Sequence, residues 1–294
     1  MPEARAPAIF DHPLNAARRR RALAAGATPG FLGTAAADDI GLRLSAITRE
    51  FADVVVLGAA GSSLPAMVAR RPGTRRVTAC DEVAWPGVDL VFDHESPDLA
   101  PVSADCILWP LGLERINDIP GCLARLGRVL RPDGLFMVVL LAGSSLAELR
   151  AAWTQAEADL RGGASPRVAP FADVRDLGAL LQRAGLALPV ADLDRLTVRY
   201  ASGLDLMRDL KAMGLANGLV ERSRGLTSPA LLARAAAVYD RDCGDADGRV
   251  RATIELATLT AWAPHVNQQQ PLKPGSARMR LAEALGTREI ELKR

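Results

Sequence analysis

Short apolar runs recur along the first half of the chain and alternate with stretches of helical spacing. Ile40, Leu44, Ile47 and Phe51 are spaced for one helix face and predict a helix over residues 38–51. Five runs rich in β-branched and apolar residues predict strands at 53–57, 75–81, 88–93, 104–109 and 135–142. Strands that alternate with helices in this way predict a doubly wound, parallel α/β sheet.

The second half continues with helices and two further strands. Helices are predicted near 119–130, 145–160 and 173–184, and the first of these ends in "RPDG", where Pro132 and Gly134 indicate a stop and a turn. Strands are predicted at 194–200 and 252–262, with helices at 204–213 and 229–240 between them. We expect this intervening piece to be a lid, since active-site covers are commonly built from insertions around a sheet.

Composition narrows the classes of function. The 294 residues are 49% hydrophobic and 4% aromatic, with a net charge of +2, which suits one well-buried core and gives little support to nucleic-acid binding. The basic run 18–21 is interpreted as a solvated helix face. No apolar run reaches the roughly 18–20 residues that span a bilayer, and the first residues lack the apolar core of a secretion signal. We therefore expect no transmembrane segment and a cytoplasmic protein.

Metal chemistry finds no support in the sequence. The four cysteines form no CxxC pair, and the three histidines are far apart along the chain. Buried free thiols are the expected state of the cysteines. The sequence therefore predicts no metal site.

The loop after the first strand, Gly58-Ala59-Ala60-Gly61-Ser62, is the first candidate for chemistry. In open α/β sheets ligands bind beyond the carboxyl ends of the strands, and glycine lets the backbone approach a ligand with positive φ. An ordinary strand-to-helix turn explains the same residues equally well.

Acidic residues at strand ends are the second candidate. Asp81 ends the second predicted strand, where a carboxylate is placed to accept the two hydroxyls of a ribose. Asp93 and Glu95 follow the third strand, where an acid is placed to accept from an adenine amino group. The alternative for each is solvation or helix capping.

Longer motifs carry a resemblance to a known family. The block 93–136, and within it "NDIPGCLARLGRVLRPDGLF" at 117–136, resembles class I S-adenosylmethionine-dependent methyltransferases. The similar subgroup contains malonyl-carrier-protein methyltransferase and the methyltransferase-like assembly factor of respiratory complex I. Further matches are "IFDHPL" at 9–14, "GGASPRVAPFADVRDLGALLQRAG" at 162–185 and "DRLTVRY" at 194–200. The end "AWAPHVNQQQPLKPGSARMRLAEALG" at 261–286 is similar to the alphaproteobacterial branch of the assembly-factor group.

The resemblance implies a Rossmann-like, mostly parallel sheet of seven strands with a helical lid between the last two. It implies an S-adenosylmethionine pocket and a protein substrate or assembly partner. Its relatives are described as hydroxylating an arginine of a complex I subunit or methylating a carboxyl group. Carried onto this chain, the cofactor-binding residues are Gly58, Gly61, Asp81, Asp93, Glu95 and Leu111. No catalytic residue is assigned, and the oligomeric state is left open.

Departures from the family pattern gather at the methionine end of that pocket. Val56 stands where the family has an acid, Ala60 and Ser62 replace glycines, and Trp109 replaces a small polar residue. The family's His-Trp pair becomes Glu114-Arg115. Weak S-adenosylmethionine binding, a different nucleoside ligand, and loss of catalysis all agree with this pattern. Two functions therefore stay open, a protein-modifying enzyme and a non-catalytic assembly or chaperone-like protein.

The predicted domain organisation follows from both lines of argument. It comprises a basic arm at 1–37, a methyltransferase-like core at 38–201, a helical lid at 202–251, a last core strand at 252–264 and a tail at 265–294. The tail has prolines, cations and few apolar residues, a composition typical of a disordered terminus. Against that, its family-like pattern favours docking across the domain or onto a partner.

Overall fold

The computed structural model describes residues 8–26, 30–269 and 286–287. The chain forms two compact units, Met1–Pro264 and His265–Arg294, and the fold below is that of the first. The predicted docking of the tail falls mainly on 270–285 and 288–294, outside the described residues.

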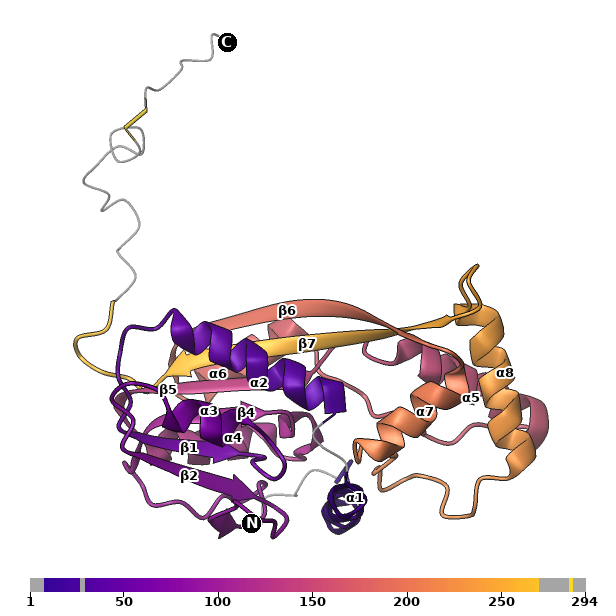
Figure 1. The fold of residues 1–294 in the computed structure, drawn as a ribbon, viewed down its shortest axis with the longest axis horizontal. Helices are drawn as coiled ribbons and strands as arrows, with labels where there is room; N and C mark the ends of the chain where they lie inside the picture. Colours follow the sequence, from indigo (N-terminus) through magenta and orange to yellow (C-terminus); the bar gives the residue numbers. More distant parts are fainter. Residues whose placement is uncertain (1–7, 27–29, 270–285, 288–294) are drawn as a thin grey trace, which may run out of the picture. The chain divides into compact units, whose positions relative to one another are not determined.

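One mixed sheet of seven strands organises the first unit (Figure 1). Its order is β3-β2-β1-β4-β5-β7-β6. Strands β1 to β5 pair in parallel, whereas β7 is antiparallel to both β5 and β6. The strands are β1 (Asp53–Leu57), β2 (Arg76–Asp81), β3 (Leu90–Val91), β4 (Ala104–Pro110), β5 (Leu130–Leu141), β6 (Ala187–Tyr200) and β7 (Val250–Trp262).

Helices cover both faces of this sheet. They are α1 (His12–Ala24), α2 (Gly30–Ser45), α3 (Leu64–Ala69), α4 (Ile119–Val129), α5 (Ala147–Arg161), α6 (Val174–Arg183), α7 (Gly203–Ala212) and α8 (Pro229–Cys243), with a short 3₁₀ turn at Leu113–Arg115. In β1, Val54 and Val56 pack under α2 and α3, while Val55 and Leu57 pack under α4 and α6. This alternation explains the continuous apolar runs, because neighbouring residues of a strand covered on both faces are buried on opposite sides.

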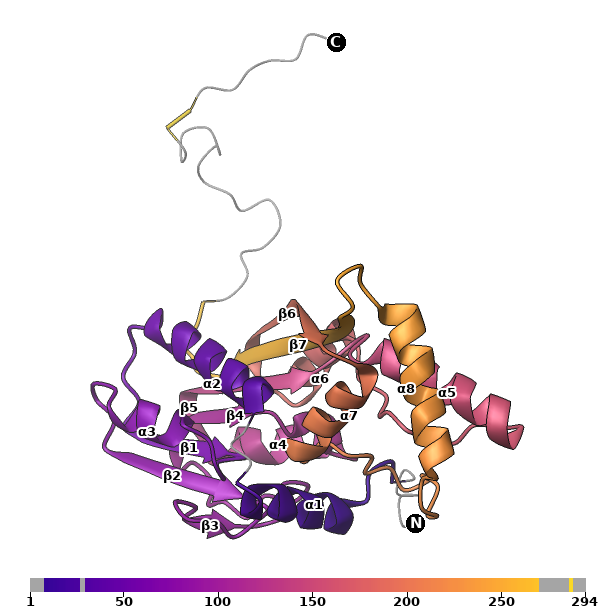
Figure 2. The ribbon, with the colours of Figure 1, turned by 45° about the vertical axis from the view of Figure 1, so that its right-hand side comes forward.

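The lid helices α7 and α8 lie between β6 and β7 in the sequence. Figures 1 and 2 show them gathered with α5 at one end of the first unit, beyond the carboxyl ends of the parallel strands. The seven-stranded, mostly parallel sheet with this insertion confirms the predicted fold class. The domain boundaries stay predictions, and Met1–Pro264, which includes arm, core and lid, forms one compact unit.

Several predicted elements have wrong bounds, among them β6, which was predicted at 194–200 and is Ala187–Tyr200. The helix predicted at 38–51 is α2, Gly30–Ser45, because Leu32 and Ala36 extend the buried stripe of Ile40 and Leu44 toward the N-terminus. Strand β5 begins at Leu130, so the predicted "RPDG" turn lies inside it. There Asp133 adopts a φ of 62°, and its N–H donates to the carbonyl of Ala263 at 3.1 Å.

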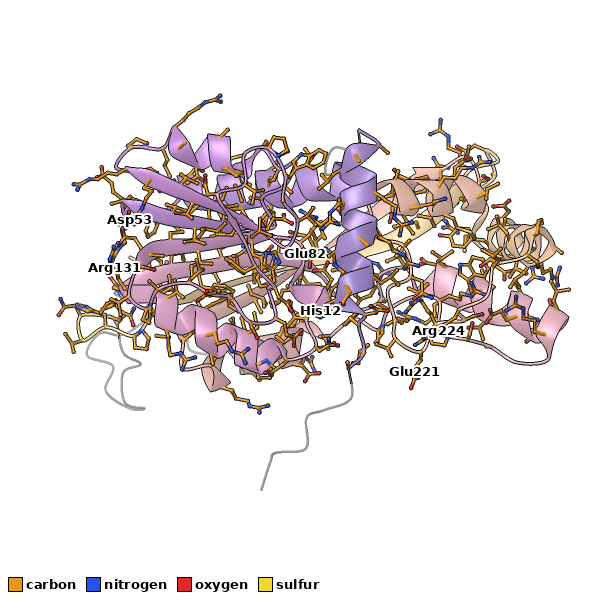
Figure 3. The ribbon with its side chains drawn as sticks, turned by 90° about the horizontal axis from the view of Figure 1, so that it is seen from below. His12, Asp53, Glu82, Arg131, Glu221 and Arg224 are labelled. Carbon is orange, nitrogen blue, oxygen red and sulfur yellow. The ribbon has the colours of Figure 1, made fainter. Side chains whose placement is uncertain are left out.

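At the amino ends of the strands an ionic cluster closes the sheet. Arg131 lies 2.9 Å from a carboxylate oxygen of Asp53 (Figure 3) and 2.8 Å from one of Asp105. The sequence predicts the site at the opposite, carboxyl ends of the strands.

Across the described ranges, no helix is long and apolar enough to cross a membrane.

Candidate nucleoside site and lid cavity

The loop after β1 has the conformation that its glycines allow. Gly58 and Gly61 adopt φ values of 65° and 73°, in the left-handed region. The N–H of Ala59 donates to the carbonyl of Cys80 at 3.1 Å, which holds the loop against the end of β2. The loop therefore lies beside Asp81, as expected for neighbouring parallel strands.

Asp81 is fully buried, and both oxygens of its carboxylate accept hydrogen bonds from other groups of the protein. Arg19 of α1 donates from Nη2 to Oδ2 at 2.8 Å and from Nε to Oδ1 at 3.2 Å. The N–H groups of Ala60 and Val83 donate to the same two oxygens, at 2.9 and 3.1 Å. Burial alone would raise the pKa of Asp81, but the Arg19 guanidinium and these bonds offset it and hold the pKa below its usual value.

Arg19 also contacts the glycine loop directly. Its Nη2 lies 3.3 Å from the carbonyl oxygens of both Gly58 and Ala60. The predicted solvated face is thus wrong for Arg19, and also for Arg18, which is half-buried and donates to the carbonyl of Asn217, whereas Arg20 and Arg21 are exposed. Helical spacing distinguishes Arg19 from the neighbouring arginines. Asn15, Arg19 and Leu23 are four residues apart and so share one face of α1, and Asn15 and Leu23 are the buried residues of that helix.

The other two predicted acids also meet α1, through His12. Nδ1 of His12 lies 3.2 Å from Asp93, and Nε2 lies 2.9 Å from Glu95. Glu95 accepts in addition from the N–H of Asn117 at 2.9 Å. The Asn117 side chain accepts from the N–H groups at the start of the arm, including that of Phe10 at 2.8 Å. Figure 3 shows α1 across the carboxyl ends of the strands, with His12 at its start and Glu82 beside it.

Trp109 fills the space at the end of β4. Its indole is fully buried between Gly58 and Gly112, so that a Cβ on Gly112 would lie 2.6 Å from Nε1. Leu111 continues past it with a φ of 67°, and its N–H donates to the carbonyl of Val139 at 2.8 Å. The ring of His94 meets the indole edge to face at 5.2 Å.

His94 is a buried neutral base that the sequence reasoning missed. Burial lowers the pKa of His94, although the carboxylates of Glu82 and Asp81 act in the other direction. Neither Nε2 of His94 nor Nε1 of Trp109 has a hydrogen-bond partner within the part of the chain that the structure describes. A cavity of only about 20 Å³ remains beside His94, roughly the size of one water molecule.

S-adenosylmethionine does not fit this arrangement. The oxygens of Asp81 that would accept ribose hydroxyls are engaged by Arg19 and two backbone amides. The indole of Trp109 takes the space next to Gly58. The six predicted residues, Gly58, Gly61, Asp81, Asp93, Glu95 and Leu111, surround the carboxyl ends of the strands, but the protein's own groups meet the three acids.

A much larger cavity, of about 410 Å³, lies on the side of α1 that faces the lid helices, and we call it the lid cavity. Its wall is mainly apolar, with Leu149 and Trp153 from α5 and Met207 and Leu210 from α7. Phe10 and Asn15 complete the wall from the N-terminal arm. Arg167 lies over the Trp153 ring at 4.8 Å and pairs with Glu157, and this contact holds the cavity edge in place.

Glu114 lies between Gly112, at the end of β4, and the large cavity. Its side chain is 3% exposed, and Oε2 accepts from the N–H of Gly112 at 2.8 Å. Oε1 has no hydrogen-bond donor in the described residues, and the nearest cation, Nε of Arg115, is 3.9 Å away, too far for a hydrogen bond. Of the described residues that line the large cavity, Glu114 alone is acidic.

The cysteines are in the state that the sequence predicts. All four cysteines are buried free thiols. Burial raises the pKa of Cys80 and Cys122 to about 12, so both thiols stay protonated at neutral pH. Within the described ranges no group of three or more His, Cys, Asp or Glu side chains is placed to hold a metal ion.

Solved structures define the class of fold. A putative methyltransferase from Bacillus halodurans aligns with a TM-score of 0.50 and 12% identity, over 77% of this chain and 98% of that one. The YcgJ protein from Bacillus subtilis aligns with a TM-score of 0.53 and 13% identity, over 76% and 97%. The chain has the Rossmann-like fold of class I S-adenosylmethionine-dependent methyltransferases.

Proteins of similar sequence identify more specific relatives than the solved structures do. The mitochondrial arginine-hydroxylase NDUFAF5 is 37% identical in Danio rerio over 198 residues, 67% of this chain and 61% of the relative. The Homo sapiens protein is 36% identical over 202 residues, 69% and 58%. Malonyl-[acyl-carrier protein] O-methyltransferase of Laribacter hongkongensis is 39% identical over 183 residues, 62% and 59%. No family model matches the chain.

The chain is therefore a homologue of NDUFAF5 and of malonyl-[acyl-carrier protein] O-methyltransferase, which confirms the resemblance inferred from its motifs. It spans about three fifths of the length of these curated relatives. Its place in an alphaproteobacterial branch stays a prediction.

Proposed function

We propose that this chain acts on a polypeptide during the assembly of respiratory complex I, and that the lid cavity receives a side chain of that polypeptide. The observation that carries the proposal is the cavity of about 410 Å³ with Glu114 on its wall. The homologous NDUFAF5 proteins, named arginine-hydroxylases, support a protein arginine as the group received.

The chemistry of the wall suits such a side chain. An arginine has a long apolar stem and a guanidinium that carboxylates bind well. Leu149 and Trp153 offer apolar surface for the stem, and Glu114 has a buried oxygen that lacks a donor. Three cations, Arg115, Arg167 and Lys211, line the same cavity, so a guanidinium reaches this oxygen only when the wall rearranges. Arg115 is the group that would have to turn away from Glu114 when a second guanidinium arrives.

S-adenosylmethionine is the proposed ligand of the neighbouring site, which we call the nucleoside site: Gly58, Gly61, Asp81, Asp93, Glu95 and the backbone of Leu111. The fold class and the three acids support this proposal. In the structure Arg19 and Trp109 take the space of this ligand, so its binding requires both side chains to move.

A second candidate is a methyltransferase-fold assembly protein without catalysis. It is favoured by the ion pair of Arg19 with Asp81 and by Trp109, which together fill the nucleoside site with the protein's own side chains. Both candidates have a protein partner and no nucleic acid, and for both we propose a cytoplasmic location.

Deletion of the gene tests the proposal. We expect the deletion to lower the amount of assembled complex I in the membranes, and a wild-type copy to restore it. Mass spectrometry of the complex I subunits then separates the candidates. An arginine that gains oxygen or a methyl group only in the presence of this protein supports the enzyme, whereas loss of complex I with no modified residue supports the non-catalytic protein. Unchanged complex I in the deletion strain would contradict both.

A further inference from the structure

The three acids predicted for the nucleoside site share one feature, which is contact with α1. Asp81 is bound by Arg19, and the two ring nitrogens of His12 lie 3.2 Å from Asp93 and 2.9 Å from Glu95. Arg19 and His12 belong to the same helix, so one element engages the acceptors proposed for the ribose and for the adenine. We infer that α1 is an internal competitor of nucleoside binding and has to leave these acids before an adenosyl ligand enters.

The manner in which α1 is held supports a reversible contact. Of its residues only Asn15 and Leu23 are buried within the described structure. The apolar contact of α1 is one small cluster, in which Leu23 and Ala16 pack with Ala60 and Val83, so the apolar surface exposed when the helix moves away is confined to that cluster. Its contacts to the site are ion pairs and hydrogen bonds, and the Arg19 side chain keeps 21% of its surface exposed. Ribose hydroxyls and an adenine amino group donate to the same kinds of oxygen, so a ligand can replace the hydrogen bonds of these contacts, although not the positive charge of Arg19.

The same arm also forms part of the lid cavity. Phe10 and Asn15 line that cavity, and the N–H of Asp11 donates at 2.9 Å to the carbonyl of Gly218, which also lines it. Asp11 also pairs with Arg222 at 3.1 Å. Displacement of α1 by a nucleoside would therefore loosen one wall of the cavity, which couples the nucleoside site to the site proposed for the polypeptide.

Calorimetric titration with adenosine, and separately with S-adenosylhomocysteine, tests this inference on the full chain. It compares the wild type with Arg19→Ala and with Arg20→Ala, a change of the exposed neighbour on the same helix. We expect Arg19→Ala to bind adenosine at least about tenfold more tightly than the wild type, because the ligand no longer displaces a charge-assisted bond. Arg20→Ala is expected to match the wild type, and adding Asp81→Asn to Arg19→Ala is expected to abolish the gain.

The inference rests on the proposed nucleoside site, and the outcomes separate the two. Equal adenosine affinity of the wild type and a folded Arg19→Ala would overturn the competition while leaving the site in place. Absence of binding by every folded variant would overturn both. Should Arg19→Ala fail to fold, Arg19→Lys takes its place with the same expected order, since lysine keeps the charge but cannot form the two-pronged contact with Asp81.

Discussion

Arg19 and Asp81, 62 positions apart in the chain, form a two-pronged ion pair at the carboxyl end of β2, with distances of 2.8 and 3.2 Å. Two backbone amides complete the shell of the carboxylate. The pair fastens α1 to the core at the position where a class I methyltransferase fold would bind a nucleoside. It therefore links the stability of the arm to the state of the proposed site.

Replacing Arg19 by methionine is expected to destabilise the protein by about 3–5 kcal/mol, because the buried carboxylate of Asp81 loses its cation while the volume is kept. Urea unfolding followed by circular dichroism measures the free energy. Arg20→Met is the matched control and is expected to stay within about 0.5 kcal/mol of the wild type, since Arg20 is exposed. Equal unfolding free energies of the two variants would show that the ion pair contributes nothing.

His94 is expected to make stability depend on pH. Burial lowers its pKa in the folded state, so below about pH 6.5 the unfolded state binds a proton that the folded state does not. This contribution is complete above pH 6.5 and is lost as the pH falls, by up to about 1.4 kcal/mol per pH unit. Urea unfolding of the wild type and of His94→Gln at pH 7.5 and 5.5 measures it, with the smaller drop expected in the variant. Identical drops would contradict a buried neutral His94.

Gly112 is expected to tolerate no side chain. Its φ of 131° is unfavourable for other residues, and a Cβ would lie 2.6 Å from the Trp109 indole. Gly112→Ala should therefore lose about 1–3 kcal/mol more stability than Gly87→Ala. Gly87 also has a positive φ, of 83°, but no atom lies within 4 Å of its added Cβ, so it reports the backbone effect alone. Thermal and urea unfolding of both variants compare them, and equal losses would mean that Trp109 does not fill this space.

The central strands of the sheet were predictable because their buried residues form nearly continuous apolar runs in the sequence. Strand β1 was predicted at its observed bounds, since all of its apolar residues are covered from both sides. Strand β3, predicted at 88–93, is only Leu90–Val91, because at Asp89 the side chain and not the backbone carbonyl accepts from the N–H of Ala79 in β2. The predicted ends of an element were wrong where polar residues belong to it, as in β5, which begins at Leu130 and includes the polar residues of "RPDG".

The contacts of the site were only half predictable. Asp81, Asp93 and Glu95 follow from their places at strand ends, because parallel strands bring their carboxyl ends to one edge. Their partners Arg19 and His12 come from a helix whose position is set by tertiary packing, over sequence separations of 62 and 81. Within the run of arginines at 18–21, only the phase shared with Asn15 and Leu23 distinguishes Arg19.

The lid cavity is expected to be the place where the polypeptide binds, and a bulky side chain there tests this most directly. Leu149→Trp fills the cavity from α5, whereas Leu160→Trp changes a residue of the same helix that is 53% exposed and does not line it. Both variants are to be expressed from the chromosomal position, with folding checked by thermal unfolding, and the amount of assembled complex I measured in the membranes. The proposed function predicts that Leu149→Trp lowers complex I to the level of the deletion strain while Leu160→Trp keeps the wild-type amount. Wild-type amounts of complex I with a folded Leu149→Trp protein would contradict it.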